Sequence, residues 1–298
     1  MDQPLLNYMR PGIVLCVAYP AAVDDGDALV RGIESVASDV FFSSVEVRDV
    51  PNGDARRRMV EILRASRLDV VYEAYPRLRR LGLSLSSTDV ARRAASVLEA
   101  KRSIDEAIEI GAVRVNVASG PDPGPGGRDE AGDALVDSLY TLAAYAAGQE
   151  GPALALEPLP RVGQDASLIG STAAAVATAQ LVREVYPDFG LTLDTGYTAL
   201  LDEDLAAALT VAAPYLGQVH LSNMVPGSLN AAPPLGVAGG LYDADHLAAA
   251  LLELFRAGFF GVGRRPLVSF RVAPDAGERA DWIIAGAKRT LTEAWTRL

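Results

Sequence analysis

The sequence predicts a (β/α)8 barrel, also called a TIM barrel, that forms one domain over residues 1–298. Short apolar runs alternate with longer segments of helical periodicity, and eight such repeats indicate a closed barrel better than an open sheet. The length of 298 residues suits one barrel. We find no linker and no break in composition that would divide the chain.

Eight apolar runs are expected to be the strands. Several lack polar alternation, which is typical of parallel strands that are buried on both faces. The predicted strands are 13–19, 43–47, 69–75, 113–118, 153–156, 191–193, 217–221 and 267–272. Cys16 falls in the first run, where a small buried residue is a better interpretation than a nucleophile.

The segments between these runs are expected to be helices and loops. Leu135, Leu139 and Leu142 repeat at helical spacing, and the last helical pattern runs from about 277 to 298. Ser171 offers a hydroxyl that can cap a following helix. The glycine- and proline-rich segment 120–127 follows the fourth strand, and we interpret it as a connecting loop at the C-terminal face of the barrel.

Composition excludes several classes of function. The net charge of −11 disfavours nucleic-acid binding, because an acidic chain repels phosphate. No apolar run is long enough to cross a membrane, and the first residues lack the positive region of a signal peptide, so we expect a cytoplasmic protein. A single cysteine allows no internal disulfide.

The lysine content argues against one type of catalysis. Lys101 and Lys288 are the only lysines, and both lie in segments that read as helix. Schiff-base chemistry requires a lysine that is desolvated inside the barrel. A class I aldolase mechanism is therefore not expected.

Three residues at the ends of consecutive predicted strands are the main candidates for chemistry. Glu157 ends the fifth strand, Asp194 ends the sixth, and His220 lies near the end of the seventh. Adjacent strand ends meet in a parallel barrel, so these side chains are expected to converge. Two carboxylates and an imidazole suit Mn²⁺, Co²⁺, Fe²⁺, Mg²⁺ or Zn²⁺.

The order of these motifs resembles the xylose isomerase-like TIM barrel superfamily, which includes the sugar phosphate isomerase/epimerase family. The resemblance rests on Glu157-Pro158, then Leu193-Asp194-Thr195-Gly196, then Val219-His220-Leu221. Two further segments agree: 45–48, with its glutamate, resembles the second strand, and 84–115 resembles the third helix and fourth strand. The resemblance covers nearly the whole chain.

The resemblance implies a metal-assisted proton transfer. Members of this superfamily bind one divalent metal through Glu, Asp, His and a second Glu, and the two glutamates move a proton through an enediolate. By motif match, Glu157, Asp194 and His220 fill the first three places.

The fourth place departs from the family pattern, so the metal site is degenerate. Arg271 stands where the eighth strand of the family carries its glutamate, and arginine cannot bind a metal. Two outcomes stay open. Either three ligands hold a metal, or the guanidinium replaces the metal and bonds to Glu157 or Asp194 at about 2.7–2.9 Å.

Other candidates are expected to contact substrate. Tyr197 and Asn223 replace a histidine of the repair-nuclease branch and a common aspartate, which excludes a nuclease that needs several metals. Four more residues lie at or just past strand ends. The predicted substrate-binding residues are Glu46, Glu73, Ser119, Arg161, Tyr197 and Asn223.

Two functions are compatible with this sequence. The first is an isomerase, epimerase or related lyase that acts on a small polyhydroxylated or carbonyl-bearing substrate, with Glu157, His220 and Arg271 as catalytic residues. The second is a non-catalytic barrel that binds a small molecule or supports a partner subunit. A homodimer is compatible with either.

Overall fold

The computed structural model describes residues 3–50, 52–160, 166–228, 232–261 and 263–298. Contacts within the chain group the residues into two compact units. The first unit contains Met1–Glu46, Val50–Leu68 and Leu193–Leu298, and the second contains Val47–Asp49 and Asp69–Thr192. The organisation as a single domain stays a prediction.

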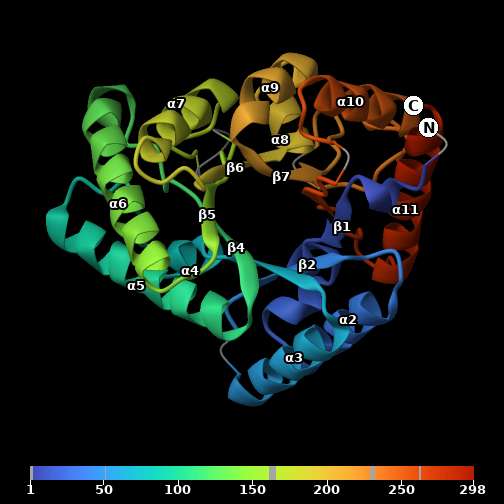
Figure 1. Ribbon diagram of the computed structural model, residues 1–298, viewed down its shortest axis with the longest axis horizontal. Helices are drawn as coiled ribbons and strands as arrows, with labels where there is room; N and C mark the ends of the chain where they lie inside the picture. Colours follow the sequence, from blue (N-terminus) through green and yellow to red (C-terminus); the bar gives the residue numbers. More distant parts are fainter. Residues whose placement is uncertain (1–2, 51, 161–165, 229–231, 262) are drawn as a thin grey trace. The chain divides into compact units, whose positions relative to one another are not determined.

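Eight strands form one sheet with the order β1-β8-β7-β6-β5-β4-β3-β2, and helices connect them, as the (β/α)8 barrel requires (Figure 1). A parallel bridge joins Val14, just after β1, to Glu46 of β2. The strands are β1 (Arg10–Ile13), β2 (Ser44–Arg48), β3 (Asp69–Glu73), β4 (Ala112–Val117), β5 (Ala153–Leu156), β6 (Gly190–Asp194), β7 (Leu216–Leu221) and β8 (Leu267–Phe270). Seven of them agree with the predicted runs to within a few residues.

The first strand was predicted wrongly. It ends at Ile13, where the predicted run began, and Cys16 lies in the short helix α1 (Leu15–Ala18). The amide of Tyr19 donates to Leu15 O at 2.8 Å, which closes the helical turn. Leu15 is fully buried, so this helix is as apolar as a strand, and periodicity does not separate the two over so few residues.

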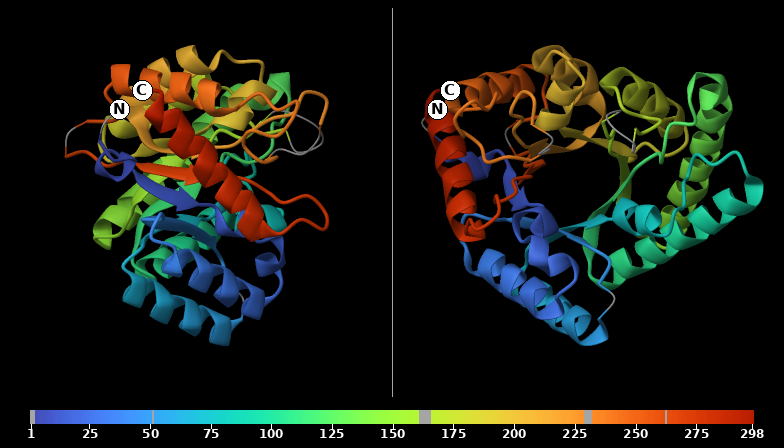
Figure 2. Two further views of the ribbon diagram at one scale, coloured as in Figure 1. Left: turned by 90° about the vertical axis from the view of Figure 1, so that its right-hand side faces the viewer. Right: turned by 180° about the vertical axis from the view of Figure 1, so that it is seen from behind.

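Helices follow the strands around the sheet, and among the described residues β1, β3 and β6 are each followed by two α-helices. In the second unit, α5 and α6 lie side by side, and in the first unit α2 lies against α3 (Figures 1 and 2). The longer helices are α2 (Gly26–Ser38), α3 (Gly53–Ser66), α5 (Val90–Glu109), α6 (Arg128–Gly148), α7 (Thr172–Arg183), α10 (Ala244–Arg256) and α11 (Ala280–Thr296). The shorter ones are α4 (Tyr75–Arg80), α8 (Thr195–Leu200) and α9 (Leu205–Ala212).

Side-chain caps fix where several helices begin. Ser171 caps α7 by accepting a hydrogen bond from the amide of Ala174, as predicted. Asp89 caps α5 and Asp243 caps α10 in the same way, because a helix start leaves amide groups without intrahelical partners. His246, in the first turn of α10, is exposed and bonds to Asp243, and the lysines Lys101 and Lys288 lie on helices, as expected.

Within the described residues, no helix is both long enough and apolar enough to cross a membrane.

Close packing of small residues inside the first unit gives a direct test of the strand arrangement. Gly12 of β1 pairs with Ser269 of β8. A methyl group added at Gly12 would lie 2.2 Å from Ser44 Oγ and 2.6 Å from Ser269 Oγ. Only a residue without a side chain fits between Ser44 and Ser269.

We expect Gly12→Ala to lower the free energy of unfolding by about 1–3 kcal/mol, because the added methyl group overpacks the interior. Gly132→Ala is the matched control: Gly132 lies in α6 with open space around it, so alanine should be neutral or stabilise by about 0.5–1 kcal/mol. Urea denaturation of both variants measures this. Equal effects at the two positions would contradict the packing of β1 between Ser44 and Ser269.

Candidate active site

Asp194 is the centre of the polar cluster in the first unit. It is the last residue of β6 and the N-cap of α8, and its side chain is 1% exposed. Its Oδ1 accepts hydrogen bonds from Tyr197 N at 2.9 Å and from Ser222 Oγ. Its Oδ2 is buried and has no hydrogen-bond partner among the described residues. One oxygen is therefore fixed by the fold, and the other is directed toward charged neighbours.

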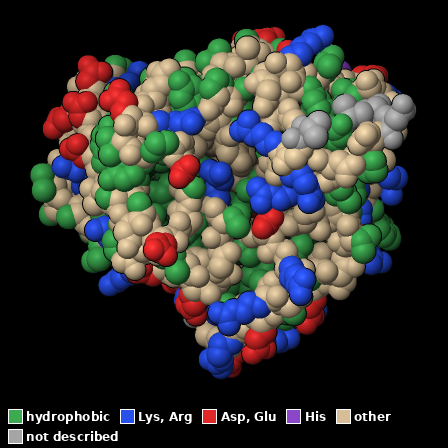
Figure 3. All heavy atoms as spheres, viewed as in Figure 1, with side chains coloured by type: hydrophobic (Ala, Val, Ile, Leu, Met, Phe, Trp, Pro, Cys, Tyr) green, Lys and Arg blue, Asp and Glu red, His purple; other side chains and the backbone are tan. Residues whose placement is uncertain are grey.

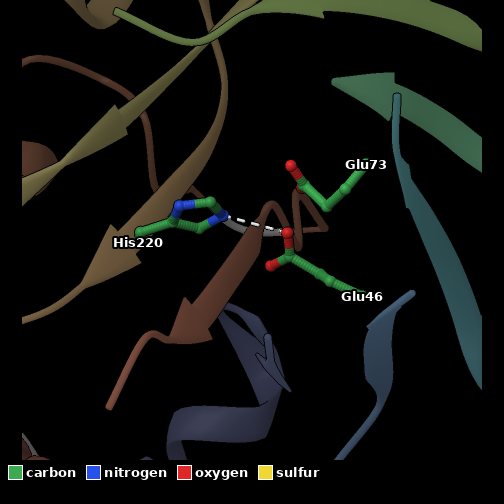
Figure 4. A group of neighbouring side chains, drawn as sticks. All are labelled: Glu46, Glu73 and His220. Atoms are coloured by element: carbon green, nitrogen blue, oxygen red, sulfur yellow. Dashed lines mark hydrogen bonds and ion pairs between the residues drawn. The ribbon is translucent and has the colours of Figure 1, made fainter. Parts of the chain in front are cut away.

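His220 lies between two carboxylates. Its Nε2 is 3.0 Å from Glu46 Oε2, and its Nδ1 is 3.9 Å from Asp194 Oδ2. Figure 4 shows the ring of His220, from β7, directed toward Glu46 on β2. An ionised carboxylate only accepts hydrogen bonds, so Nε2 carries the proton and Nδ1 faces Asp194.

Glu46 is itself held from the other side. Gln218, two residues before His220 on the same strand, donates from Nε2 to Glu46 Oε1 at 2.5 Å and to Ser269 Oγ at 3.2 Å. Both side chains are buried. Glu46 is predicted to contact substrate, and this role stays a prediction; its contact with His220 orients the imidazole ring. The sequence analysis missed Gln218, although the spacing of two residues along a strand places it on the same face as His220.

If the guanidinium replaces the metal, Arg271 is expected to bond to Glu157 or Asp194, and it makes no hydrogen bond to Asp194. Its Nε is 3.9 Å from Asp194 Oδ2, which is an ion-pair distance and not a hydrogen bond of 2.7–2.9 Å. The guanidinium carbon lies 4.4 Å from the centre of the Tyr197 ring. Stacking on an aromatic face holds a guanidinium through a cation–π interaction. This contact keeps the charge near Asp194 without a direct bond to it.

The turn after β6 requires glycine. A methyl group at Gly196 would lie 2.4 Å from Ser222 Oγ and 2.7 Å from Asn223 O. Ser222 Oγ also accepts a hydrogen bond from Gly196 N at 2.8 Å. The Asp-Thr-Gly sequence therefore lets the residues after β7 approach closely enough for Ser222 to reach Asp194.

Tyr242 borders the same cluster. Burial raises the pKa of its phenol, a hydrogen bond with Thr198 opposes this, and the charge of Asp194 raises the pKa further. The phenol is therefore a neutral neighbour of the cluster at ordinary pH.

The second unit has its own chain of buried polar groups. Asn116 of β4 donates from Nδ2 to Glu73 Oε1 at 2.8 Å, and Thr192 Oγ1 donates to Asn116 Oδ1 at 2.9 Å. Glu157 directly follows β5, is 1% exposed, and donates from its amide to Val117 O at 2.9 Å. Leu156 of β5 pairs with Leu191 of β6, so the strand that carries Glu157 lies next to β6.

The remaining predicted substrate contacts have other surroundings. Ser119 Oγ is 2.9 Å from Ser167 Oγ and accepts from Ile169 N at 3.0 Å. Asn223 donates to Pro234 O and accepts from the amides of Met224 and Tyr242, so its side chain organises the segment after β7. Arg161 lies outside the described residues. The role of each in substrate binding stays a prediction.

Acidic and histidine side chains that could hold a metal ion occur in both units, Glu46, Asp194 and His220 in the first and Glu73 and Glu157 in the second. Within the first unit, Asp194 Oδ2 and His220 Nδ1 are 3.9 Å apart. Two donors can share an ion that is about 2.0–2.2 Å from each, so this separation fits a divalent metal. The buried Oδ2 that accepts no hydrogen bond fits it as well.

Comparison with known proteins identifies the family to which the chain belongs. A family model described as a xylose isomerase-like TIM barrel matches residues 32–266. The chain belongs to this family. Membership accounts for the (β/α)8 fold. The matched segment ends at residue 266, before β8 begins, so Arg271 lies outside it.

Solved structures of similar fold include sugar epimerases. A 3-keto-D-glucoside 4-epimerase from E. coli has a TM-score of 0.66 at 17% identity, with 97% of this chain and 99% of that chain covered. A D-tagatose 3-epimerase-like protein has a TM-score of 0.69 at 17% identity, covering 97% and 99%. A D-psicose 3-epimerase from Clostridium cellulolyticum H10, solved with D-tagatose, has 0.68 at 16%, covering 97% and 98%. At these identities the likeness shows the fold alone. No curated protein matches the sequence.

Ser222 gives a test of how Asp194 is held. We expect Ser222→Ala to lower the free energy of unfolding by about 1–3 kcal/mol, because it removes a donor from a buried carboxylate. Thr210→Ala is the control, since its hydroxyl bonds to Ala206 O on an exposed helix face and its loss should cost less than about 0.5 kcal/mol. Chemical denaturation measures both. A cost at Ser222 no larger than at Thr210 would contradict the bond to Asp194.

Proposed function

We propose that this protein is an enzyme of the sugar isomerase/epimerase type, which moves a proton next to the carbonyl of a small polyhydroxylated substrate. The observation that carries the proposal is the imidazole of His220, held between buried carboxylates with the Arg271 guanidinium across from it. Buried titratable groups of this kind at the C-terminal ends of barrel strands are typical of catalytic sites. The epimerases among the structural neighbours support a carbohydrate-like substrate.

Glu157 is the proposed base. It follows β5 directly and is 1% exposed. A carboxylate can accept a proton from a carbon that lies next to a carbonyl. Arg271 then stabilises the negative charge that develops on the substrate oxygen, because a fixed cation in a buried site acts strongly on developing charge.

The metal is part of the same proposal. Asp194 and His220 would hold it, together with Glu157 in the place that the motif gives it, and a bound divalent ion would polarise the carbonyl oxygen of the substrate. Arg271 Nε lies 3.9 Å from Asp194 Oδ2, which accepts no hydrogen bond from the guanidinium. This distance favours a metal with three ligands over replacement of the metal by the guanidinium. The three-ligand set leaves positions open for substrate oxygens.

The loss of the second glutamate limits the reaction. Epimerisation with two bases removes a proton from one face and returns it to the other. With Arg271 in the fourth place, one base remains by motif match, so proton return occurs on the same face. Aldose–ketose isomerisation and elimination of a β-hydroxyl group both need only one base.

The test combines proton exchange with metal analysis. Purified protein incubated with a panel of ketoses and aldoses in D2O should introduce deuterium next to the carbonyl, as detected by NMR. Glu157→Gln should slow this exchange by about 10²–10⁴-fold. If no substrate exchanges deuterium and the purified protein binds no metal, the result would instead favour the non-catalytic binding barrel.

Arg271→Glu tests the fourth place. This substitution should restore a four-ligand set and raise the affinity for Mn²⁺ or Co²⁺ by about tenfold or more. Arg279→Glu is the matched control, because Arg279 is exposed and the same charge change there should leave metal affinity unaltered. Calorimetric titration after removal of metal measures both. Unchanged affinity in Arg271→Glu would show that position 271 is not next to the metal site.

A further inference from the structure

The second unit contains a cavity of about 440 Å³, and among the described residues none of the predicted site residues lines it. Most of its wall surface is apolar, and Leu78, Leu83, Leu85, Ala118 and Leu159 contribute to it beside serine and arginine residues. On the face drawn in Figure 3, hydrophobic side chains gather in a hollow on the side of α6. A cavity of this size and lining is typical of small-molecule sites.

The cavity is fixed by the packing of two loops. The segment between α4 and α5 lies against the residues after β4: Ser86 N donates to Ser119 O at 3.2 Å, and Leu83 N donates back to Leu78 O at 2.9 Å. Gly120 has φ +96°, and a methyl group there would lie 2.1 Å from Ser84 Oγ. The two loops are therefore fixed against each other, and this contact keeps them from collapsing into the cavity.

Several polar groups in the wall already have hydrogen-bond partners in the protein. Ser84 Oγ is 3.0 Å from Ser86 Oγ and accepts from Ser86 N at 3.2 Å. Asp122 is bound by Arg128 through both of its oxygens. Because most of the wall surface is apolar, a sugar ring buried here would place several of its hydroxyl groups against carbon atoms, which is costly. An apolar group suits this wall.

The cavity is lined by residues that follow two paired strands of the second unit, β4 and β5. Ala118 is the first residue after β4, and Leu159 lies two residues beyond Glu157. We propose that the substrate of this enzyme carries an apolar substituent, of about the size of a phenyl ring, that occupies this cavity. A cavity of about 150 Å³ already holds benzene. This inference rests on the proposed function, in which the hydroxylated part of the substrate meets Glu157.

Binding of a matched pair of probes tests the proposal without requiring turnover. Phenyl β-D-glucopyranoside and methyl β-D-glucopyranoside share the sugar and differ in the apolar group. We expect the phenyl compound to bind at least about tenfold more tightly by calorimetry. Equal binding, or no binding of either compound, would overturn the proposal.

Variants locate the effect. Leu83→Asp should abolish the preference for the phenyl compound, whereas Leu81→Asp should retain it, because Leu81 is 50% exposed and does not line the cavity. Thr88→Trp, at an exposed position of the lining, should block the cavity even if Leu83→Asp fails to fold. A preference that survives both substitutions would place the phenyl group elsewhere.

The binding test and the test of the proposed function can fail independently of each other. If the phenyl preference is present and no substrate exchanges deuterium, the cavity stands and the catalytic proposal fails. If a substrate exchanges deuterium but the two probes bind equally, the catalytic proposal stands and the proposal of an apolar substituent is wrong.

Discussion

A buried carboxylate requires positive charge or hydrogen-bond donors around it, and Asp194 imposes this requirement on the first unit. The fold meets half of it with neutral donors, the amide of Tyr197 and the hydroxyl of Ser222, which approach because Gly196 has no side chain. The second oxygen faces the Arg271 guanidinium and the imidazole of His220, both at 3.9 Å, and neither donates a hydrogen bond to it.

This arrangement is compatible with the motif match, by which Arg271 stands where the family carries a glutamate. Its stacking on Tyr197 fixes the guanidinium at a distance from Asp194, so the charge contributes to the cluster without closing it. Glu46 makes a corresponding contribution on the far side of His220, where it fixes which ring nitrogen carries the proton. Carboxylates that orient a histidine through its second nitrogen are common around metal sites.

The sequence predicted the fold and the strand-end residues because both follow from periodicity and order along the chain. Seven of the eight runs, the Ser171 cap and the placement of Asp194 and His220 at strand ends are properties of local pattern. The first strand failed because α1 is too short for a helical period to appear. The distance of 3.9 Å from Arg271 to Asp194 does not follow from local pattern, because Tyr197 stacks on the guanidinium across 74 positions of sequence.

Contacts between residues distant in the sequence account for what the sequence analysis missed. Nothing in the segments around Ser222 or Gln218 indicates that they bind Asp194 and Glu46, since these bonds join strands that are far apart along the chain. The apolar cavity likewise depends on how the loop after α4 packs on the residues after β4. Loop packing of this kind has no periodic signal.

The most direct test of the account is ¹⁵N NMR of the two histidines, His220 and His246, during titration with Zn²⁺. The account predicts that His220 keeps its proton on Nε2, bonded to Glu46, while the Nδ1 resonance shifts as metal binds toward Asp194. His246, exposed and bonded to Asp243, serves as the internal reference. A shift at Nε2 instead of Nδ1, or no shift at either nitrogen of His220, would contradict the account.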